Sequence, residues 1–286
     1  MYVSVIIPAK NEGSSIGELV GKIRDLTFDK EIIVVDDGST DETADIAEHQ
    51  GARVIRHPYS IGNGAAVKDG ARAARGDILV FMDGDGQHDP DDIERLLARL
   101  GECHAMVVGA RDKDTHASRG RRGANAVYNL LASYMSGHSV RDLTSGFRAV
   151  RAAAFKEYLY LLPNGFSYPT TITMAFFRAG LPVAYEPIRA RDRVGKSHIR
   201  VFRDGTRFLV IIFKIGTLYS PLKLFAPLSL AFFLTGIGWY GYTFATLGRF
   251  TNMSALLITG SFLTFAMGLI SEQITALMYR DSDQRH

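Results

Sequence analysis

Two aspartates separated by one glycine carry the most specific chemical signal in the sequence. Asp83-Gly84-Asp85, followed by Gly86 and Gln87, comes directly after the apolar run from Asp77 to Met82. Two carboxylates at this spacing, with the amide oxygen of Gln87, suit Mg²⁺ or Mn²⁺ shared with a diphosphate. Such a cation neutralises the negative charge that grows on a leaving phosphate group. A solvated turn is the alternative for the tripeptide alone, but its place at the end of an apolar run favours a binding site.

Two other polar segments also end apolar runs. Asp36-Asp37-Gly38-Ser39 follows one run, and Pro8-Ala9-Lys10-Asn11-Glu12 closes another. A carboxylate at such a position can bond a base or a ribose hydroxyl. Ser39 or Thr40 also suits an N-cap, and both roles are compatible. The glycines Gly62 and Gly64 fall short of a dinucleotide fingerprint, because Val67 stands where the third glycine should be.

The elements that position these residues follow from the local pattern. Four short β-branched runs predict strands at Val3 to Pro8, Glu31 to Asp36, Arg53 to Arg56 and Asp77 to Met82. Helix-like stretches follow the strands in turn, at Ser14 to Leu26, Thr40 to His49, Gly64 to Ala74 and Pro90 to Leu100. This alternation predicts an α/β fold, a mostly parallel sheet with helices on both faces and ligands at the strands' carboxyl ends.

Composition excludes several classes of protein. The 286 residues, 47% of them hydrophobic, can bury a sizeable core. A formal net charge of +3 argues against a nucleic-acid binder, which needs a broad basic face. Cys103 is the single cysteine, so neither an intrachain disulfide nor a cysteine zinc site is expected, which fits a reducing compartment. The N-terminus shows no pattern of a cleavable signal peptide.

The composition changes near residue 220 from that of a soluble chain to that of a membrane segment. Leu224 to Leu247 contains no charged residue, and about 24 residues at ~1.5 Å each exceed the ~30 Å hydrocarbon thickness. A second apolar stretch runs from Phe250 to Ser271 and continues past Glu272 to Tyr279. We therefore predict membrane-spanning helices at 222–248 and 251–279, the alternative being two buried helices of a soluble domain.

Basic residues predict the sidedness of this hairpin. Arg203, Arg207, Lys214 and Lys223 precede it and Arg280 follows it, whereas its loop carries only Arg249. The positive-inside rule then places a catalytic domain at 1–198 and a tail at 280–286 in the cytoplasm. The stretch 199–219 mixes arginines with bulky apolar residues and predicts an interfacial helix, or an amphipathic helix packed on the domain.

Seven cationic side chains crowd the segment before the membrane. Arginine binds phosphate oxygens in bidentate fashion, and general attraction to anionic headgroups would use the same residues. The seven are Arg189, Arg191, Arg193, Lys196, Arg200, Arg203 and Arg207.

Taken together in this order, the motifs resemble the inverting family 2 glycosyltransferases with the Rossmann-like GT-A fold, in particular the polyprenyl- and dolichyl-phosphate hexose synthases. The resemblance covers almost the whole chain. It rests on VSVIIPAKNE (3–12), VVDDGS (34–39), MDGDGQHDP (82–90), GAR (109–111), DLTSGFR (142–148) and GKS (195–197).

The resemblance implies a role for each matching residue. A nucleotide-sugar would be bound by Pro8, Ala9, Asn11, Glu12, Asp36, Asp37, Gly64, Asp83 and Gly84, and Mg²⁺ or Mn²⁺ by Asp83, Asp85 and Gln87. The acceptor phosphate would meet Arg111, Arg121, Asn125, Arg193 and Ser197, with Asp85, Asp142 and Arg111 as the catalytic set. A homo-oligomer such as a tetramer is also implied.

Departures from the family pattern narrow the expected reaction. The only Gln-x-x-Arg, Gln50 to Arg53, precedes Val54 rather than tryptophan, which argues against a processive polymerase. Some relatives carry an aspartate, as a possible base, where this chain has Ser145-Gly146-Phe147. His198 stands where close relatives have lysine, so a fixed cation near the acceptor is lost or depends on pH.

The sequence hypothesis is therefore one in-line displacement from a UDP- or GDP-sugar to a polyprenyl phosphate, undecaprenyl or dolichyl, at the bilayer. A phosphate monoester with a second pKa of about 6 is largely ionised at neutral pH, so it needs no strong base. Asp142 is then a weaker candidate that orients the acceptor. Transfer to a hydroxyl of a lipid-linked saccharide, which needs a base, and a non-catalytic membrane scaffold are the alternatives.

Overall fold

A computed structural model describes residues 1–101, 103–111, 119–165, 168–188, 213, 216–217 and 219–283, with only the backbone at 119–125 and 280–283. The chain divides into two compact units. The first comprises Met1–Tyr134 and His138–Ile199, and the second comprises Met135–Gly137 and Arg200–His286.

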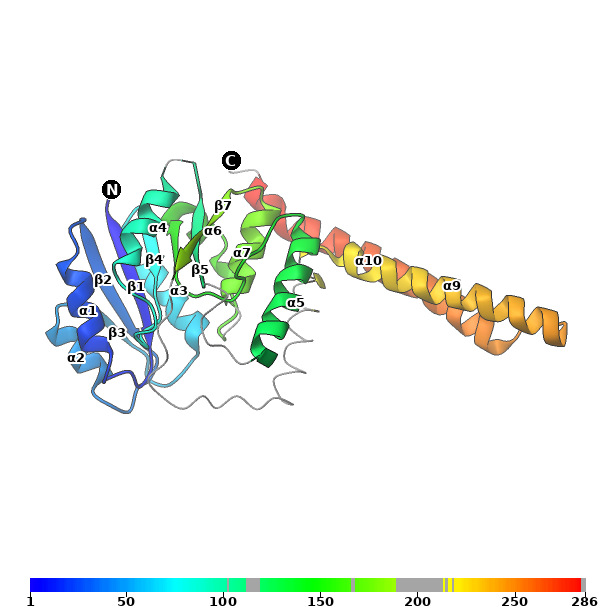
Figure 1. Cartoon of the computed structure of the whole chain (residues 1–286), viewed down its shortest axis with the longest axis horizontal. Coiled ribbons are helices and arrows are strands. Elements are labelled where there is room, and N and C mark those ends of the chain that lie inside the picture. The colour runs from blue at the N-terminus through cyan, green and yellow to red at the C-terminus, as the bar shows by residue number, and fades with distance from the viewer. Residues whose placement is uncertain are drawn as a thin grey trace. The chain divides into compact units, whose positions relative to one another are not determined.

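The first unit is built on a sheet that has seven strands in the described part of the chain (Figure 1). Its order is β3-β2-β1-β4-β6-β5-β7, and β6 alone among them runs antiparallel to its neighbours. The strands are β1 (Val3–Ala9), β2 (Lys30–Asp36), β3 (Arg53–Arg56), β4 (Ile78–Phe81), β5 (Met106–Arg111), β6 (Arg148–Arg151) and β7 (Val183–Ile188).

The helices confirm the predicted alternation over the first hundred residues. They are α1 (Ile16–Asp25), α2 (Thr43–His49), α3 (Asn63–Ala73), α4 (Asp92–Leu100), α5 (Arg119–Ser136), α6 (Ala152–Glu157) and α7 (Tyr168–Arg178), with a 3₁₀ turn η1 at Leu159–Leu161. The predicted cap of α2 is wrong. Glu42 occupies the N-cap position, and the Ser39 hydroxyl bonds the Asp36 carboxylate instead.

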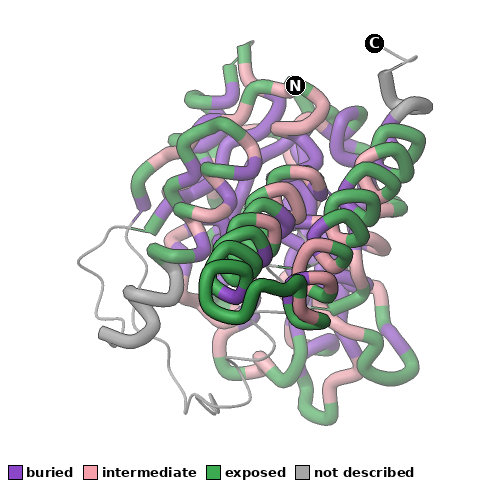
Figure 2. Tube along the Cα trace, turned by 90° about the vertical axis from the view of Figure 1, so that its right-hand side faces the viewer, coloured by how far each residue is buried: buried purple, intermediate pink, exposed green. Residues whose placement is uncertain are grey.

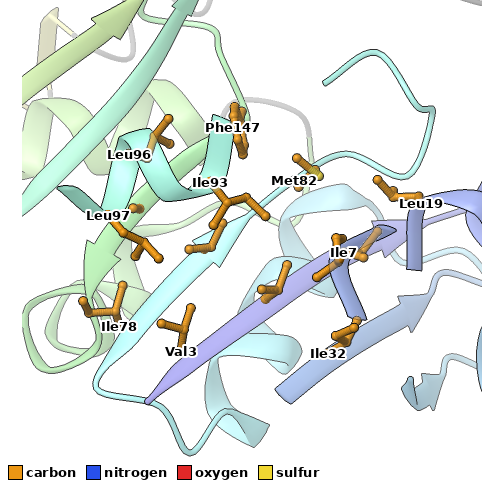
Figure 3. Packing of buried hydrophobic residues seen from close by; sticks show 14 of the residues in the cluster. Val3, Ile7, Leu19, Ile32, Ile78, Met82, Ile93, Leu96, Leu97 and Phe147 are labelled. Carbon is orange, nitrogen blue, oxygen red and sulfur yellow. The ribbon is translucent and has the colours of Figure 1, made fainter. Parts of the chain in front are cut away.

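Apolar side chains leave the sheet on both faces, and helices cover each face. On one face Val3, Val5 and Ile7 of β1 join buried residues of α1 and α4 in one cluster, part of which Figure 3 shows. On the other face a Cβ at Gly70 of α3 would lie 2.4 Å from the Ile6 side chain, so the helix packs closely on β1. The Phe81 ring lies 4.6 Å from that of Phe155 in α6. The prediction of a mostly parallel, doubly covered sheet is confirmed.

The strand order creates one crevice at the carboxyl ends of the strands. From β1 the chain adds β2 and β3 on one side, and then crosses to place β4 on the other side. Ligands of open α/β sheets bind where the order reverses in this way. The polar segments after β1, β2 and β4 therefore meet at this crevice.

The second unit contains two long antiparallel helices, α9 (Pro221–Leu247) and α10 (Asn252–Asp283). Both are long and apolar enough to cross a membrane, and their most apolar windows have mean hydropathies of 1.5 and 1.9. Only 11% and 17% of these windows is buried, which disfavours the alternative of core helices in a soluble domain (Figure 2). The predicted helices at 222–248 and 251–279 agree within a few residues. The predicted interfacial helix at 199–219 lies almost wholly outside the described residues.

Small and polar residues join the two helices. The Ser229 hydroxyl donates to the Ser261 carbonyl at 2.9 Å, and a Cβ at Gly236 would lie 2.9 Å from the Ile258 side chain. The Glu272 carboxylate accepts a hydrogen bond from the Leu222 amide at 3.3 Å, in the first turn of α9. The positive end of a helix dipole suits a carboxylate, so Glu272 has a partner within its own hairpin.

Candidate active site

A cavity of about 400 Å³ opens at the crevice and collects the ends of three parallel strands. It is lined by Pro8, Ala9, Lys10, Glu12, Asp37, Ser60, Gly62, Asn63, Ala66, Asp83, Gly84, Asp85 and Gly165. Six of the nine residues predicted to bind a nucleotide-sugar are among them. The other three, Asn11, Asp36 and Gly64, lie beside the cavity without lining it.

Asn11 and Asp36 shape the loops around the cavity. Asn11 takes a left-handed backbone with a φ of 55°, which asparagine tolerates better than most residues. Its side-chain oxygen accepts a hydrogen bond from the Thr40 main-chain amide at 2.8 Å. The Asn11 main-chain amide donates to the Ser39 hydroxyl at 2.9 Å. Asp36 in turn accepts the Ser39 amide at 3.1 Å. These bonds tie the end of β1 to the end of β2.

Gly64 allows a loop from later in the chain to reach the cavity. A Cβ at Gly64 would lie 2.1 Å from the Pro163 carbonyl, and one at Gly62 would lie 2.4 Å from the Asn164 carbonyl. The Ala65 amide donates to that Asn164 carbonyl at 3.1 Å. The two glycines therefore bring Gly165 into the cavity lining. This contact was not predicted from the sequence, although the closely spaced Gly62 and Gly64 were the available signal.

Asp37 organises the loop that leads into α3. Its carboxylate accepts hydrogen bonds from the Ser60 hydroxyl at 2.7 Å and the Ile61 amide at 2.8 Å, and from the Gly62 amide. The His57 imidazole lies 2.9 Å from it. Burial opposes ionisation, but these bonds outweigh it and lower the Asp37 pKa to about 2. Asp37 thus lines the cavity as a fixed negative charge.

Asp83 and Asp85 follow β4 and both line the cavity. Gly84 between them packs closely, because a Cβ there would lie 3.3 Å from that of Ala9, and the Ser15 hydroxyl donates to the Gly84 carbonyl at 2.8 Å. The Asp85 carboxylate accepts a hydrogen bond from the Gln87 main-chain amide at 3.2 Å. The Gln87 side chain does not line the cavity.

The donor set fits a divalent cation that is shared with a ligand. Within the described ranges, no cluster of three or more His, Cys, Asp or Glu side chains could hold a metal ion by itself. Two carboxylates facing one cavity leave coordination positions for the oxygens of a diphosphate, which is how Mg²⁺ is commonly held in phosphate-transfer sites.

Arg111 and Asp142, both predicted as site residues, bind each other. The Arg111 Nε lies 2.9 Å from Asp142 Oδ2, and Nη2 lies 3.1 Å from Oδ1. The Asp142 carboxylate also accepts the Thr144 and Ser145 amides at 3.1 Å each. Burial raises the Asp142 pKa, but Arg111 and the amides outweigh it and hold the pKa below its usual range. Asp142 therefore stays ionised and is a poor proton acceptor.

His88 is a buried neighbour of the site that the sequence analysis did not single out. Its ring stacks on Phe147 with centroids 5.0 Å apart, and burial lowers its pKa to about 4. The imidazole is therefore neutral at physiological pH. It lines a second cavity, of about 270 Å³, with Glu12 and Asp85.

The remaining predicted acceptor residues are not described. Arg121 and Asn125 lie in the first part of α5, 119–125, of which the structure describes only the backbone. Arg193 and Ser197 lie outside the described residues.

Comparison with known proteins identifies the family of this chain. Residues 4–159 match the family described as Glycosyl transferase family 2, and residues 220–277 match the GtrB C-terminal hairpin. The undecaprenyl-phosphate mannosyltransferase of Micrococcus luteus is 30% identical over 230 residues, 72% of this chain and 94% of the relative. The dolichyl-phosphate hexose transferase of Haloferax volcanii is 28% identical over 215 residues, which cover 74% of this chain and 93% of the relative.

A solved structure supports the same fold. Glucosyl-3-phosphoglycerate synthase from Mycobacterium tuberculosis, in complex with Mn²⁺, UDP and phosphoglyceric acid, aligns with a TM-score of 0.60 and 26% identity. The alignment covers 75% of this chain and 78% of that one. Because the match to glycosyl transferase family 2 spans more than half of the residues, this chain belongs to that family and is a glycosyltransferase.

Proposed function

We propose that this glycosyltransferase moves a hexose, with inversion, from a UDP- or GDP-sugar to the phosphate of a polyprenyl lipid. The observation that carries the proposal is the shared cavity, in which Asp83 and Asp85 face the residues that end β1 and β2. The similarity to an undecaprenyl-phosphate mannosyltransferase and a dolichyl-phosphate hexose transferase supports a polyprenyl phosphate as acceptor.

The donor half of the reaction rests on the two aspartates. Asp83 and Asp85, which both line the cavity, would hold Mg²⁺ or Mn²⁺ against the diphosphate. The cation supplies neutralising charge for the departing nucleoside diphosphate. The Mn²⁺ and UDP named for the Mycobacterium tuberculosis synthase support a metal-bound nucleotide.

The acceptor half rests on the pairing of Arg111 with Asp142. A saccharide hydroxyl must lose a proton as it attacks, which calls for a carboxylate able to accept it. Asp142 is committed to Arg111 and two amides, and its pKa is depressed. A lipid phosphate is already largely ionised at neutral pH, so it attacks without that help. The pairing thus favours a phosphate acceptor over a hydroxyl, with Arg111 as a phosphate ligand.

The apolar hairpin supports a location at the bilayer, where such a lipid resides. We propose that the catalytic unit lies on the cytoplasmic side, because Lys223 and Arg280 flank the hairpin while Arg249 alone stands in its loop. A homo-oligomer, such as a tetramer, is a further part of the proposal, and chemical crosslinking of the purified protein tests it.

The test of the reaction uses the full chain in nanodiscs. The protein is incubated with a panel of UDP- and GDP-sugars, MnCl₂ or MgCl₂, and either a polyprenyl phosphate or the matching polyprenol, and products are identified by mass. We expect a sugar phosphodiester, labile to mild acid, from the phosphate alone and none with EDTA. Transfer to the polyprenol, or transfer that EDTA leaves unchanged, would contradict the proposal.

A further inference from the structure

Arg148 is a fully buried arginine that ends the DLTSGFR motif and begins β6. Its side chain is 0% exposed and forms no ion pair with any carboxylate of the described residues. A buried guanidinium without a counter-ion destabilises a fold unless other groups satisfy it. The nucleotide site lies close by, and nothing in the reaction outlined above uses this charge.

The guanidinium instead joins two segments of main chain. Nη2 donates to the Ser145 carbonyl, and Nη1 donates to the Pro169 carbonyl at 3.1 Å and to the Thr173 hydroxyl at 3.2 Å. The guanidinium also lies 5.7 Å from the centre of the Tyr168 ring. Arginine suits this role because its rigid fork presents donors in two directions, whereas lysine offers one ammonium.

The main chain held in this way packs directly on Asp83. The Tyr168 hydroxyl donates to the Gly146 carbonyl at 3.2 Å, so this peptide segment is held at two successive carbonyls. A Cβ added to Gly146 would lie 2.7 Å from Asp83 Oδ2 and 3.2 Å from Oδ1. Gly146 therefore packs directly against the Asp83 carboxylate, and Asp83 lines the cavity.

We propose that Arg148 is a positioning residue for the nucleotide site, which acts by holding the Ser145-Gly146 main chain against the Asp83 carboxylate. This inference rests on the proposed function, in which Asp83 binds the cation and diphosphate. It also gives a reason for glycine at position 146, because any side chain there would displace the carboxylate.

The test measures ligand binding rather than turnover. Mn²⁺ affinity in the presence of UDP is determined from the free Mn²⁺ signal by electron paramagnetic resonance, alongside thermal unfolding. The variants are Gly146→Ala, Arg148→Met and Arg148→Lys. Gly21→Ala on α1 is the matched control, since its added Cβ would meet only the Gln50 side chain, at 3.7 Å.

We expect Gly146→Ala and Arg148→Met to weaken Mn²⁺ binding at least about tenfold, in line with the usual effect of losing support around a metal ligand. Arg148→Lys should recover part of the loss, and Gly21→Ala should match the wild type. A purely structural role of Arg148 would lower the melting temperature of the Arg148 variants and leave the Mn²⁺ affinity of the folded Arg148 variants unchanged.

Two outcomes separate this inference from the proposed function. Wild-type protein that binds Mn²⁺ with UDP, together with Gly146→Ala at the same affinity, overturns the positioning role alone. Wild-type protein that binds neither Mn²⁺ nor UDP overturns the proposed function and this inference with it. If Arg148→Met does not fold, the Mn²⁺ affinity of Arg148→Lys decides, and a wild-type affinity in that variant overturns the positioning role.

Discussion

Asp142 anchors Arg111 through two parallel hydrogen bonds, 2.9 Å from Nε and 3.1 Å from Nη2. The Thr144 hydroxyl accepts a further bond from Arg111 at 2.7 Å, which leaves Nη1 as the guanidinium nitrogen that this pairing does not use. Bidentate pairs of this kind fix the plane of a guanidinium as well as its position. Asp142 therefore acts, in our proposal, through the arginine that it presents rather than on the acceptor itself.

Replacing Asp142 with Asn should impair acceptor binding and spare donor binding. One partner of a charge pair is removed, the buried carboxylate that holds the exposed Arg111, so we expect kcat/KM for polyprenyl phosphate to fall about 10- to 100-fold, with the donor KM within about twofold. Steady-state kinetics with each substrate varied in turn check this. The pH dependence provides the contrast with a base. In the wild type, kcat/KM should rise near pH ~6 as the lipid phosphate loses its second proton, and this rise should persist in Asp142→Asn. Its disappearance in the variant would restore Asp142 as a proton acceptor.

Replacing Asp85 with Asn should abolish metal-dependent transfer while the protein stays folded and inserted. The change removes one charged oxygen from the pair that would hold the cation, and we expect activity to fall by at least about 100-fold. Product formation is measured across a MnCl₂ titration, together with the melting temperature. Asp29→Asn, an exposed carboxylate outside the cavity, is the control and should behave as wild type. Full activity of Asp85→Asn would refute the metal assignment.

The stability of the wild type should depend on Asp37 at neutral pH and lose that contribution in acid. Its folded pKa of about 2 lies below the ordinary value of 3.8, so its stabilisation is full above pH ~4 and declines as the pH falls towards 2. Asp37→Asn should cost about 2 kcal/mol at pH 7 and progressively less below pH 4. Melting temperatures of the purified proteins from pH 7 to pH 3 measure the difference. A difference that stays constant over this range would show that the Asp37 charge is not responsible.

The single exposed cysteine, Cys103, reports the sidedness of the catalytic unit. With the unit in the cytoplasm, a membrane-impermeant maleimide should label Cys103 only after cells are permeabilised. A variant with Cys103→Ser and Asn252→Cys moves the thiol to the hairpin turn and should label in intact cells. Labelling of Cys103 in intact cells would reverse the orientation expected from the basic residues.

The sequence alone determined the first hundred residues of the fold and the composition of the hairpin. Short β-branched runs and their turn residues are local signals, so the strands β1 to β4 and the helices between them lie where the pattern placed them. The aspartates that follow β4 were predicted for the same reason. A parallel sheet must gather the carboxyl ends of its strands at one edge, whatever its other details.

The contacts that those residues make with one another depend on tertiary packing. Arg111 and Asp142 pair through a contact between residues 31 positions apart, and no local spacing encodes such a pair. The antiparallel insertion of β6 between β4 and β5 brings Gly146 onto Asp83, and packing of α7 buries Arg148 beneath them. These arrangements follow from long-range packing in a dense interior, where the cost of each buried charge depends on every neighbour at once.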